Sequence, residues 1–99
     1  MQTVIEHPTF TKQANKIWSA SELHAFIDWI AANPLAGDVI QGSKAGARKV
    51  RWQSSGRGKR GGARVIYYNL AEDEVIVLVM VYTKNERDSV TAKELNKEV

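Results

Sequence analysis

The hydrophobic positions in the first third of the chain repeat with the period of an α-helix. After Ser19 the apolar residues fall at i, i+3, i+4 and i+7, which places them on one helix face. They are Leu23, Phe26, Ile27 and Ile30. Ser19 and Glu22 have the spacing of a capping box, in which each side chain bonds a backbone N–H at the helix start. Pro34 disfavours helical backbone at Asn33, so the pattern predicts a helix between Ser19 and Asn33.

The residues before this helix predict one strand and one further helix. Val4–Ile5 has the composition of a short strand. Pro8 suits the first turn of a helix, where its missing N–H would have no partner in any case, and we expect this helix to run to about Trp18. The two helices should form a hairpin that covers one face of a sheet.

From Arg48 onward the period changes from that of a helix to that of a strand, after a predicted loop over 35–47. Val50 and Trp52 alternate with Lys49 and Arg51. Successive side chains of a strand point to opposite faces. We therefore expect the apolar pair to face the core and the cationic pair to face solvent or a ligand.

Two further strands and a final helix complete the predicted order. Arg64–Leu70 is rich in β-branched and aromatic residues, and Glu74–Tyr82 is apolar on both faces, which is typical of an interior strand. Thr91 and Glu94 again have capping-box spacing, which predicts a short C-terminal helix. The expected fold is a single α+β domain over residues 1–99, with a helical hairpin packed on a small, mostly antiparallel sheet in the order β-α-α-β-β-β-α.

Composition narrows the class of protein. The chain has 99 residues, of which 43% are hydrophobic, enough for one packed core. It has no cysteine, which excludes disulfides and thiolate metal sites. The start of the sequence lacks the pattern of a signal peptide, and the longest apolar run, Val75–Tyr82, is far too short to span a membrane. We expect a soluble cytoplasmic protein with no membrane partner.

Charge is distributed unevenly along the chain, although the net charge is only +3. Between Asp38 and Glu72 there is no acidic residue. This basic window carries +8, and the remaining six cations and eleven acids carry −5. The cations of the basic window are Lys44, Arg48, Lys49, Arg51, Arg57, Lys59, Arg60 and Arg64. Such asymmetry is typical of a protein that binds a polyanion; the alternative is a solvated basic face that keeps the protein soluble.

Within the basic window, Lys49 and Arg51 are the more specific candidates for catalysis. Two cations two residues apart on a strand project from the same face. Like charges held together favour the neutral lysine, which could serve as a general base beside an arginine that stabilises a phosphorane-like transition state. A pair of exposed cations that protects a sheet edge explains the same pattern equally well.

The glycine-rich segment Gly56–Gly61 formally matches the dinucleotide fingerprint. That fingerprint requires a helix after it, whereas a strand is predicted to follow, so we interpret the segment as a hairpin tip whose cations bind phosphate. Tyr67 and Tyr68 must point to opposite faces. We assign Tyr68 to RNA binding by stacking on an unpaired base; a half-buried core position is the alternative.

No cofactor or metal is predicted. His7 and His24 are isolated, and neither has a second histidine or a carboxylate at ligand spacing. His7 precedes Pro8 at a helix start, and His24 lies beside the apolar stripe of the second helix, so we interpret both as structural.

Several stretches together resemble the HigB-like branch of the RelE toxins. They are Asn33–Gly42, Arg48–Trp52, Gly56–Tyr68 and Tyr82–Glu86, so the resemblance covers roughly residues 30–95. It implies the RelE fold and a toxin of a type II toxin–antitoxin system. Such toxins are metal-independent endoribonucleases that cut mRNA on the ribosome by attack of a ribose 2′-hydroxyl on the adjacent phosphate, which stops translation.

The resemblance also implies roles for individual residues. Lys49 and Arg51 would lie near the scissile phosphate, Arg64 would stabilise the transition state, and Lys84 would assist proton transfer or bind phosphate. Asn85 and Val90 stand near the positions where the best-known RelE pattern has an arginine and a tyrosine. Tyr82 or Lys84 could supply the missing acid or base. The loop cations Lys44, Arg57, Lys59 and Arg60, with Arg48, would bind the RNA backbone.

The implied partners are the ribosome, mRNA and an acidic, HigA-like antitoxin with a helix-turn-helix DNA-binding domain. Two alternatives share the same fold expectation. A ParE-like inhibitor of DNA gyrase would damage DNA without cutting RNA, although such relatives generally lack the set Lys49, Arg51 and Arg64. A non-catalytic RNA- or ribosome-binding module would lose binding, with no separate loss of turnover, when these cations are removed.

Overall fold

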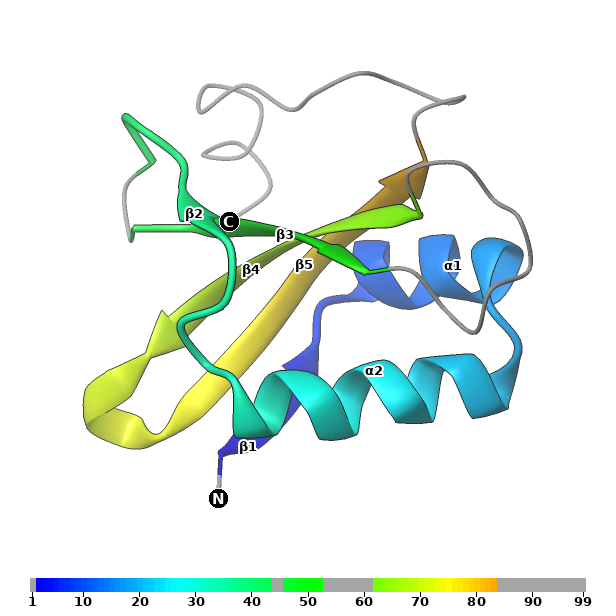
Figure 1. Cartoon of the computed structure of the whole chain (residues 1–99), viewed down its shortest axis with the longest axis horizontal. Coiled ribbons are helices and arrows are strands. Elements are labelled where there is room, and N and C mark those ends of the chain that lie inside the picture. Colours follow the sequence, from blue (N-terminus) through cyan, green and yellow to red (C-terminus); the bar gives the residue numbers. More distant parts are fainter. Residues whose placement is uncertain (1, 44–45, 53–61, 84–99) are drawn as a thin grey trace.

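The computed structural model describes residues 2–43, 46–52 and 62–83, and these form two helices and a five-stranded sheet (Figure 1). The elements follow the order β1 (Thr3–Glu6), α1 (Pro8–Ile17), α2 (Ala20–Ala32), β2 (Asp38–Val39), β3 (Arg48–Trp52), β4 (Ala63–Leu70), a 3-10 turn (Ala71–Asp73) and β5 (Val75–Thr83). Across the sheet the strands lie in the order β1-β5-β4-β3-β2. β1 runs parallel to β5, and every other neighbouring pair is antiparallel. The predicted α+β architecture is confirmed, including the interior position of β5.

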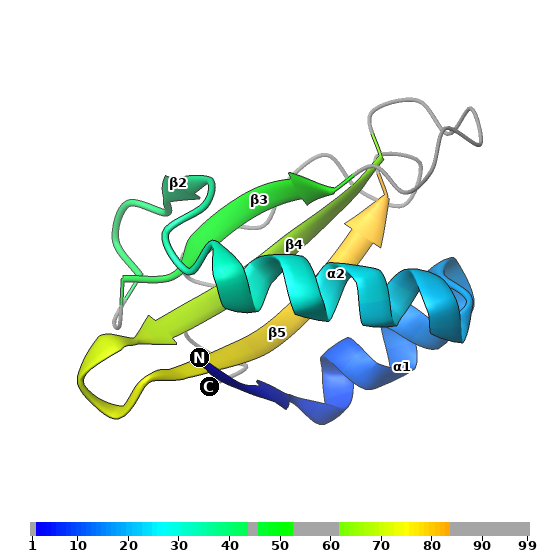
Figure 2. The same ribbon diagram turned by 60° about the horizontal axis from the view of Figure 1, so that its bottom comes forward.

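The helices form where the sequence predicts them. His7 caps α1, because its Nδ1 accepts a hydrogen bond from the Thr9 N–H at 3.2 Å, and this confirms its structural interpretation. Ser19 and Glu22 form the predicted capping box, with bonds of 3.2 and 2.9 Å. Figure 2 shows both helices on the same side of the sheet.

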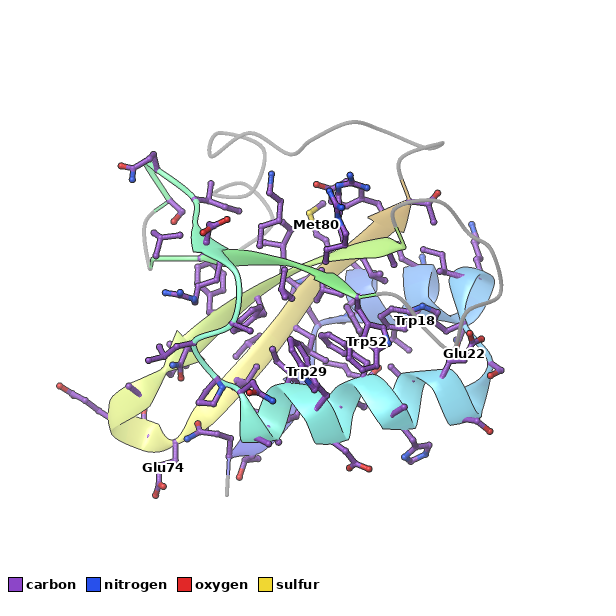
Figure 3. The ribbon with its side chains drawn as sticks, in the orientation of Figure 1. Trp18, Glu22, Trp29, Trp52, Glu74 and Met80 are labelled. Carbon is purple, nitrogen blue, oxygen red and sulfur yellow. The ribbon has the colours of Figure 1, made fainter. Side chains whose placement is uncertain are left out.

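The core lies between these helices and the sheet. Phe10, Trp18, Phe26 and Ile30 pack there against alternate residues of β3, β4 and β5. All three tryptophans belong to this core, which confirms the direction predicted for Trp52: Trp29 and Trp52 have ring centroids 5.0 Å apart, and Trp18 lies 5.4 Å from Phe26 (Figure 3). We call this side of the sheet the helix face.

The opposite side, which we call the far face, carries a second apolar cluster, and neither α1 nor α2 contributes to its described members. Its buried members are Ala47, Ile66, Tyr68, Val79, Met80 and Tyr82. In Figure 3, Met80 marks the far face and Trp29 and Trp52 mark the helix face. The sheet is therefore apolar on both sides, which explains why the β5 sequence shows no alternation.

The structure differs from the predicted elements in β2 and in several strand ends, among them β1 (Thr3–Glu6, predicted as Val4–Ile5) and the start of β4 (Ala63, predicted as Arg64). One predicted element lies beyond comparison. β2 falls inside the segment predicted as a loop, because two residues are too few to show a period of two. β5 begins at Val75 rather than Glu74, because Glu74 has a left-handed φ of 54°. The predicted helix around Thr91 and Glu94 lies outside the described residues.

A β-bulge in β5 changes which side chains share a face. Ile66 pairs with Met80, but the next residue, Tyr67, pairs with Leu78. Val79 is therefore an extra residue on β5, and both it and Met80 belong to the far-face cluster. A bulge opposes two residues to one and interrupts the alternation of the strand.

Candidate functional site

The strand register brings four of the predicted catalytic residues onto the far face. Arg51 on β3 lies opposite Arg64 on β4, and Arg64 lies opposite Tyr82 on β5. Lys49 lies in the neighbouring row, opposite Ile66. Side chains directly opposite on neighbouring strands have Cβ atoms about 4.5–5.5 Å apart. We call Arg51, Arg64 and Tyr82 the cross-strand row.

The bulge is the reason that Tyr82 belongs to this row. Leu78 packs on the helix face, and strict alternation from it would direct residue 82 to the same face. The extra residue Val79 inverts this pattern, so Val81 points to the helix face and Tyr82 points to the far face.

Burial and charge make the cross-strand row suitable for binding an anion. Arg51 is exposed, Lys49 and Arg64 are half-buried, and Tyr82 is buried. Nη1 of Arg64 is buried and has no hydrogen-bond partner in the structure as described. Like charges directly opposite destabilise a sheet, and an unpaired buried N–H adds a further cost. An anionic oxygen between the two guanidinium groups would relieve both penalties.

Arg48 lies on the other side of the sheet, away from the cross-strand row. Its side chain donates to three backbone carbonyls of the loop after α2: from Nη2 to Leu35 at 2.8 Å and Gly37 at 3.0 Å, and from Nε to Ala36 at 3.3 Å. Strand alternation from Val50 could have placed it there, because 48 and 50 share a face. These bonds occupy the guanidinium group, so we do not include Arg48 in the proposed RNA-binding surface.

Tyr67 joins Arg48 at this loop, a contact that the sequence does not predict. The two residues are cross-strand partners, and the Tyr67 hydroxyl lies 2.6 Å from the Ala36 carbonyl oxygen and 3.1 Å from that of Pro34. Burial raises the pKa of Tyr67, and the nearby Arg48 charge opposes this rise. We call Arg48 and Tyr67 the loop clamp. Because the acceptors of the loop clamp are backbone carbonyls 11 to 33 residues away in sequence, no sequence motif predicts the clamp.

Gly37 and Asp38 connect the clamped loop to the site. Gly37 has φ of +79° and lies so close to β3 that an added Cβ would overlap the Lys49 carbonyl oxygen. The next residue, Asp38, pairs with Lys49 and is exposed. A carboxylate therefore lies beside the predicted catalytic lysine. Asp38 could not be recognised from the sequence, because the segment 35–47 has the composition of a loop and two residues of strand show no period.

Tyr68 lies on the far face but apart from the cross-strand row, opposite Val77. It is only 4% exposed, and its hydroxyl is buried without a hydrogen-bond partner in the structure as described. Burial raises the pKa of Tyr68. A ring this deeply buried does not offer a stacking surface to a base, so its position agrees with the alternative of a core residue. Lys44, Arg57, Lys59, Arg60 and Lys84 lie outside the described residues, and their roles remain predictions.

The histidines and acids form no metal site within the described ranges. There, no three His, Asp or Glu residues lie close enough together to bind a metal ion. His24 is exposed on α2, so its structural interpretation remains a prediction. In the same ranges, no helix is both long and apolar enough to cross a membrane.

Comparison with solved structures assigns the fold. The chain matches the isolated E. coli RelE toxin with a TM-score of 0.62 and 18% identity, covering 100% of both chains. A free-state E. coli RelE mutant with two arginines changed to alanine gives 0.62 and 17%, covering 88% of this chain and 87% of that one. A chain of the intact E. coli RelBE toxin–antitoxin complex gives 0.61 and 17%, covering 84% of this chain and 96% of that one. No protein-family model matches. The protein therefore has the RelE fold.

Proposed function

We propose that this protein is the toxin of a type II toxin–antitoxin system and that it cuts mRNA on the ribosome. The observation that carries the proposal is the cross-strand row with Lys49 beside it, a cluster of cations on the sheet face opposite the helices. The RelE fold and the resemblance of residues 30–95 to HigB-like toxins support the same function.

The cluster suits cleavage through a ribose 2′-hydroxyl. In the proposed reaction the 2′-oxygen forms a bond to the adjacent phosphorus, its proton passes to a base, and the bond from phosphorus to the 5′-oxygen breaks. The leaving 5′-oxygen takes up a proton, which gives a 2′,3′-cyclic phosphate and a 5′-hydroxyl. Arg51 and Arg64 would stabilise the added negative charge on the phosphate oxygens. Lys49 would transfer a proton, and Tyr82 or Lys84 would supply the other proton-transfer group.

The partners follow from the same proposal. An acidic antitoxin would cover the basic window, and we propose a HigA-like protein with a helix-turn-helix domain. A toxin that acts on translating ribosomes would work in the cytoplasm. A short neighbouring reading frame that encodes such an antitoxin would support this assignment.

Cell-free translation with the purified protein tests the proposed activity. We expect cleaved mRNA with 5′-hydroxyl ends and arrested protein synthesis. Arg64→Ala should reduce the cleavage rate about 10²–10³-fold, the usual cost of removing one preorganised charge donor. Lys12→Ala is the matched control, because Lys12 is an exposed cation on α1. Intact mRNA with normal translation would refute the nuclease, and DNA damage on expression without mRNA cleavage would favour a gyrase inhibitor.

A further inference from the structure

The predicted catalytic Lys49 lies near the edge of the sheet, where support from neighbouring strands is weakest. On its inner side β3 pairs with the eight-residue β4, but on its outer side it pairs with only the two residues of β2. Pairing across two residues provides few backbone hydrogen bonds. The Ile40 N–H adds a bond to the Ala47 carbonyl oxygen at 2.8 Å, but the ladder is still short, so an interaction outside it would strengthen this outer edge.

The loop clamp supplies that interaction from the helix face. Arg48 and Tyr67 together make five hydrogen-bond contacts with the carbonyls of residues 34–37, at 2.6 to 3.3 Å. A single guanidinium group bonded to three carbonyls fixes their relative positions, because its donors form a rigid planar fork.

The clamped loop in turn packs closely against the backbone of Lys49 itself. At Gly37 an ideal Cβ would lie 2.8 Å from the Lys49 carbonyl carbon, a distance that real Cβ atoms essentially never show, and 3.0 Å from the Val50 Cα. The Lys49 side chain projects from this peptide to the far face, while the clamp acts on the helix face. The clamped loop therefore contacts the Lys49 backbone at Gly37, and the clamp side chains do not line the cationic cluster.

We propose that Arg48 and Tyr67 are positioning residues for the nuclease, an inference that rests on the proposed function. By holding residues 34–37 against β3, they fix the Lys49 ammonium group relative to Arg51 and Arg64. Their loss should therefore slow the chemical step while leaving binding to the programmed ribosome unchanged.

The test is steady-state mRNA cleavage on programmed ribosomes, at a temperature where every variant is fully folded by circular dichroism. Tyr67→Phe removes one hydroxyl from a fully buried ring, so it cannot act by losing an RNA contact. Arg48→Lys keeps the charge but removes the planar fork. We expect both variants to lower kcat about tenfold or more with little change in KM, because small misplacements of a reacting group are costly.

Ser19→Ala is the control for a loss of stability alone. It removes the capping box of α2, a change that typically costs about 1 kcal/mol, and its kcat should equal that of the unchanged protein. If Tyr67→Phe also retains the wild-type kcat, the inference is overturned. An Arg48→Lys variant with normal kcat would equally overturn it, since Arg48 would then act only through its charge. If the unchanged protein cuts no mRNA, the proposed function itself fails and this inference fails with it.

Discussion

Replacing Gly37 with alanine tests the close packing of the clamped loop against β3. The structure offers a matched control at Gly46. Both glycines have positive φ, +79° at Gly37 and +66° at Gly46, but a Cβ at Gly46 would meet nothing within 4 Å. The left-handed backbone penalty is therefore common to both substitutions, and only Gly37→Ala adds a steric overlap.

The expected magnitudes follow from these two terms. Left-handed backbone costs alanine about 1–2 kcal/mol, and the loss of freedom in the unfolded chain returns about 0.4–1 kcal/mol. Gly46→Ala should therefore destabilise the protein by about 1 kcal/mol or less. In Gly37→Ala the loop must also move away from Lys49. Losing two or three clamp bonds at about 1 kcal/mol each gives a total loss of about 3–4 kcal/mol.

Urea unfolding followed by tryptophan fluorescence measures the difference, because Trp18, Trp29 and Trp52 all lie in or against the helix-face core. The additional loss in Gly37→Ala corresponds to a melting temperature about 10–20 °C below that of Gly46→Ala. If both variants lose the same free energy of unfolding, with equal slopes in urea, the Lys49 backbone does not restrict residue 37 and the reasoning is wrong.

The remaining predictions concern the adjacent tyrosines and the acid beside Lys49. Burial raises the pKa of Tyr68 above its usual value, so the unfolded chain loses this phenolic proton first and the free energy of unfolding falls as pH rises above about 10. Tyr68→Phe should reduce this alkaline loss of unfolding free energy. At pH 7 the same substitution should change the free energy of unfolding little, because the buried Tyr68 hydroxyl makes no described hydrogen bond. A loss of stability at pH 7 as large as that of Tyr67→Phe would contradict this expectation. Asp38→Asn removes an exposed negative charge opposite Lys49. It should tighten the binding of a 2′-O-methyl RNA by about two- to fivefold, the size expected for an exposed charge pair. Weaker binding in a fluorescence-anisotropy titration would argue against RNA at this site.

Local patterns were sufficient to predict the helices and the direction of the key strand residues. The capping box at Ser19 and the apolar spacing of α2 are properties of neighbouring residues. The alternation in β3 likewise predicts that Val50 faces the core, away from Lys49. Each of these inferences needs only one segment of chain.

Features that depend on the meeting of distant segments could not be predicted in this way. The pairing of Arg51 with Arg64, and of Arg64 with Tyr82, is a matter of register between strands. The clamp depends on where a loop lies, because its acceptors are main-chain carbonyls that every residue possesses. The sequence predicts RNA binding by Arg48 because composition counts a cation without showing what it contacts, whereas its three bonds to loop carbonyls depend on the fold.

The bulge at Val79 has a consequence for how this fold can vary. β5 is apolar on both faces, so moving the extra residue along the strand would exchange one apolar side chain for another and bury no charge. If the extra residue stood beyond Tyr82 instead, Val81 would stand opposite Arg64. The third member of the cross-strand row can thus be exchanged by a shift of register, without any substitution at the two arginines. A single residue inserted or deleted between Val79 and Tyr82 can therefore replace the tyrosine that we propose for proton transfer, while the two arginines stay in place.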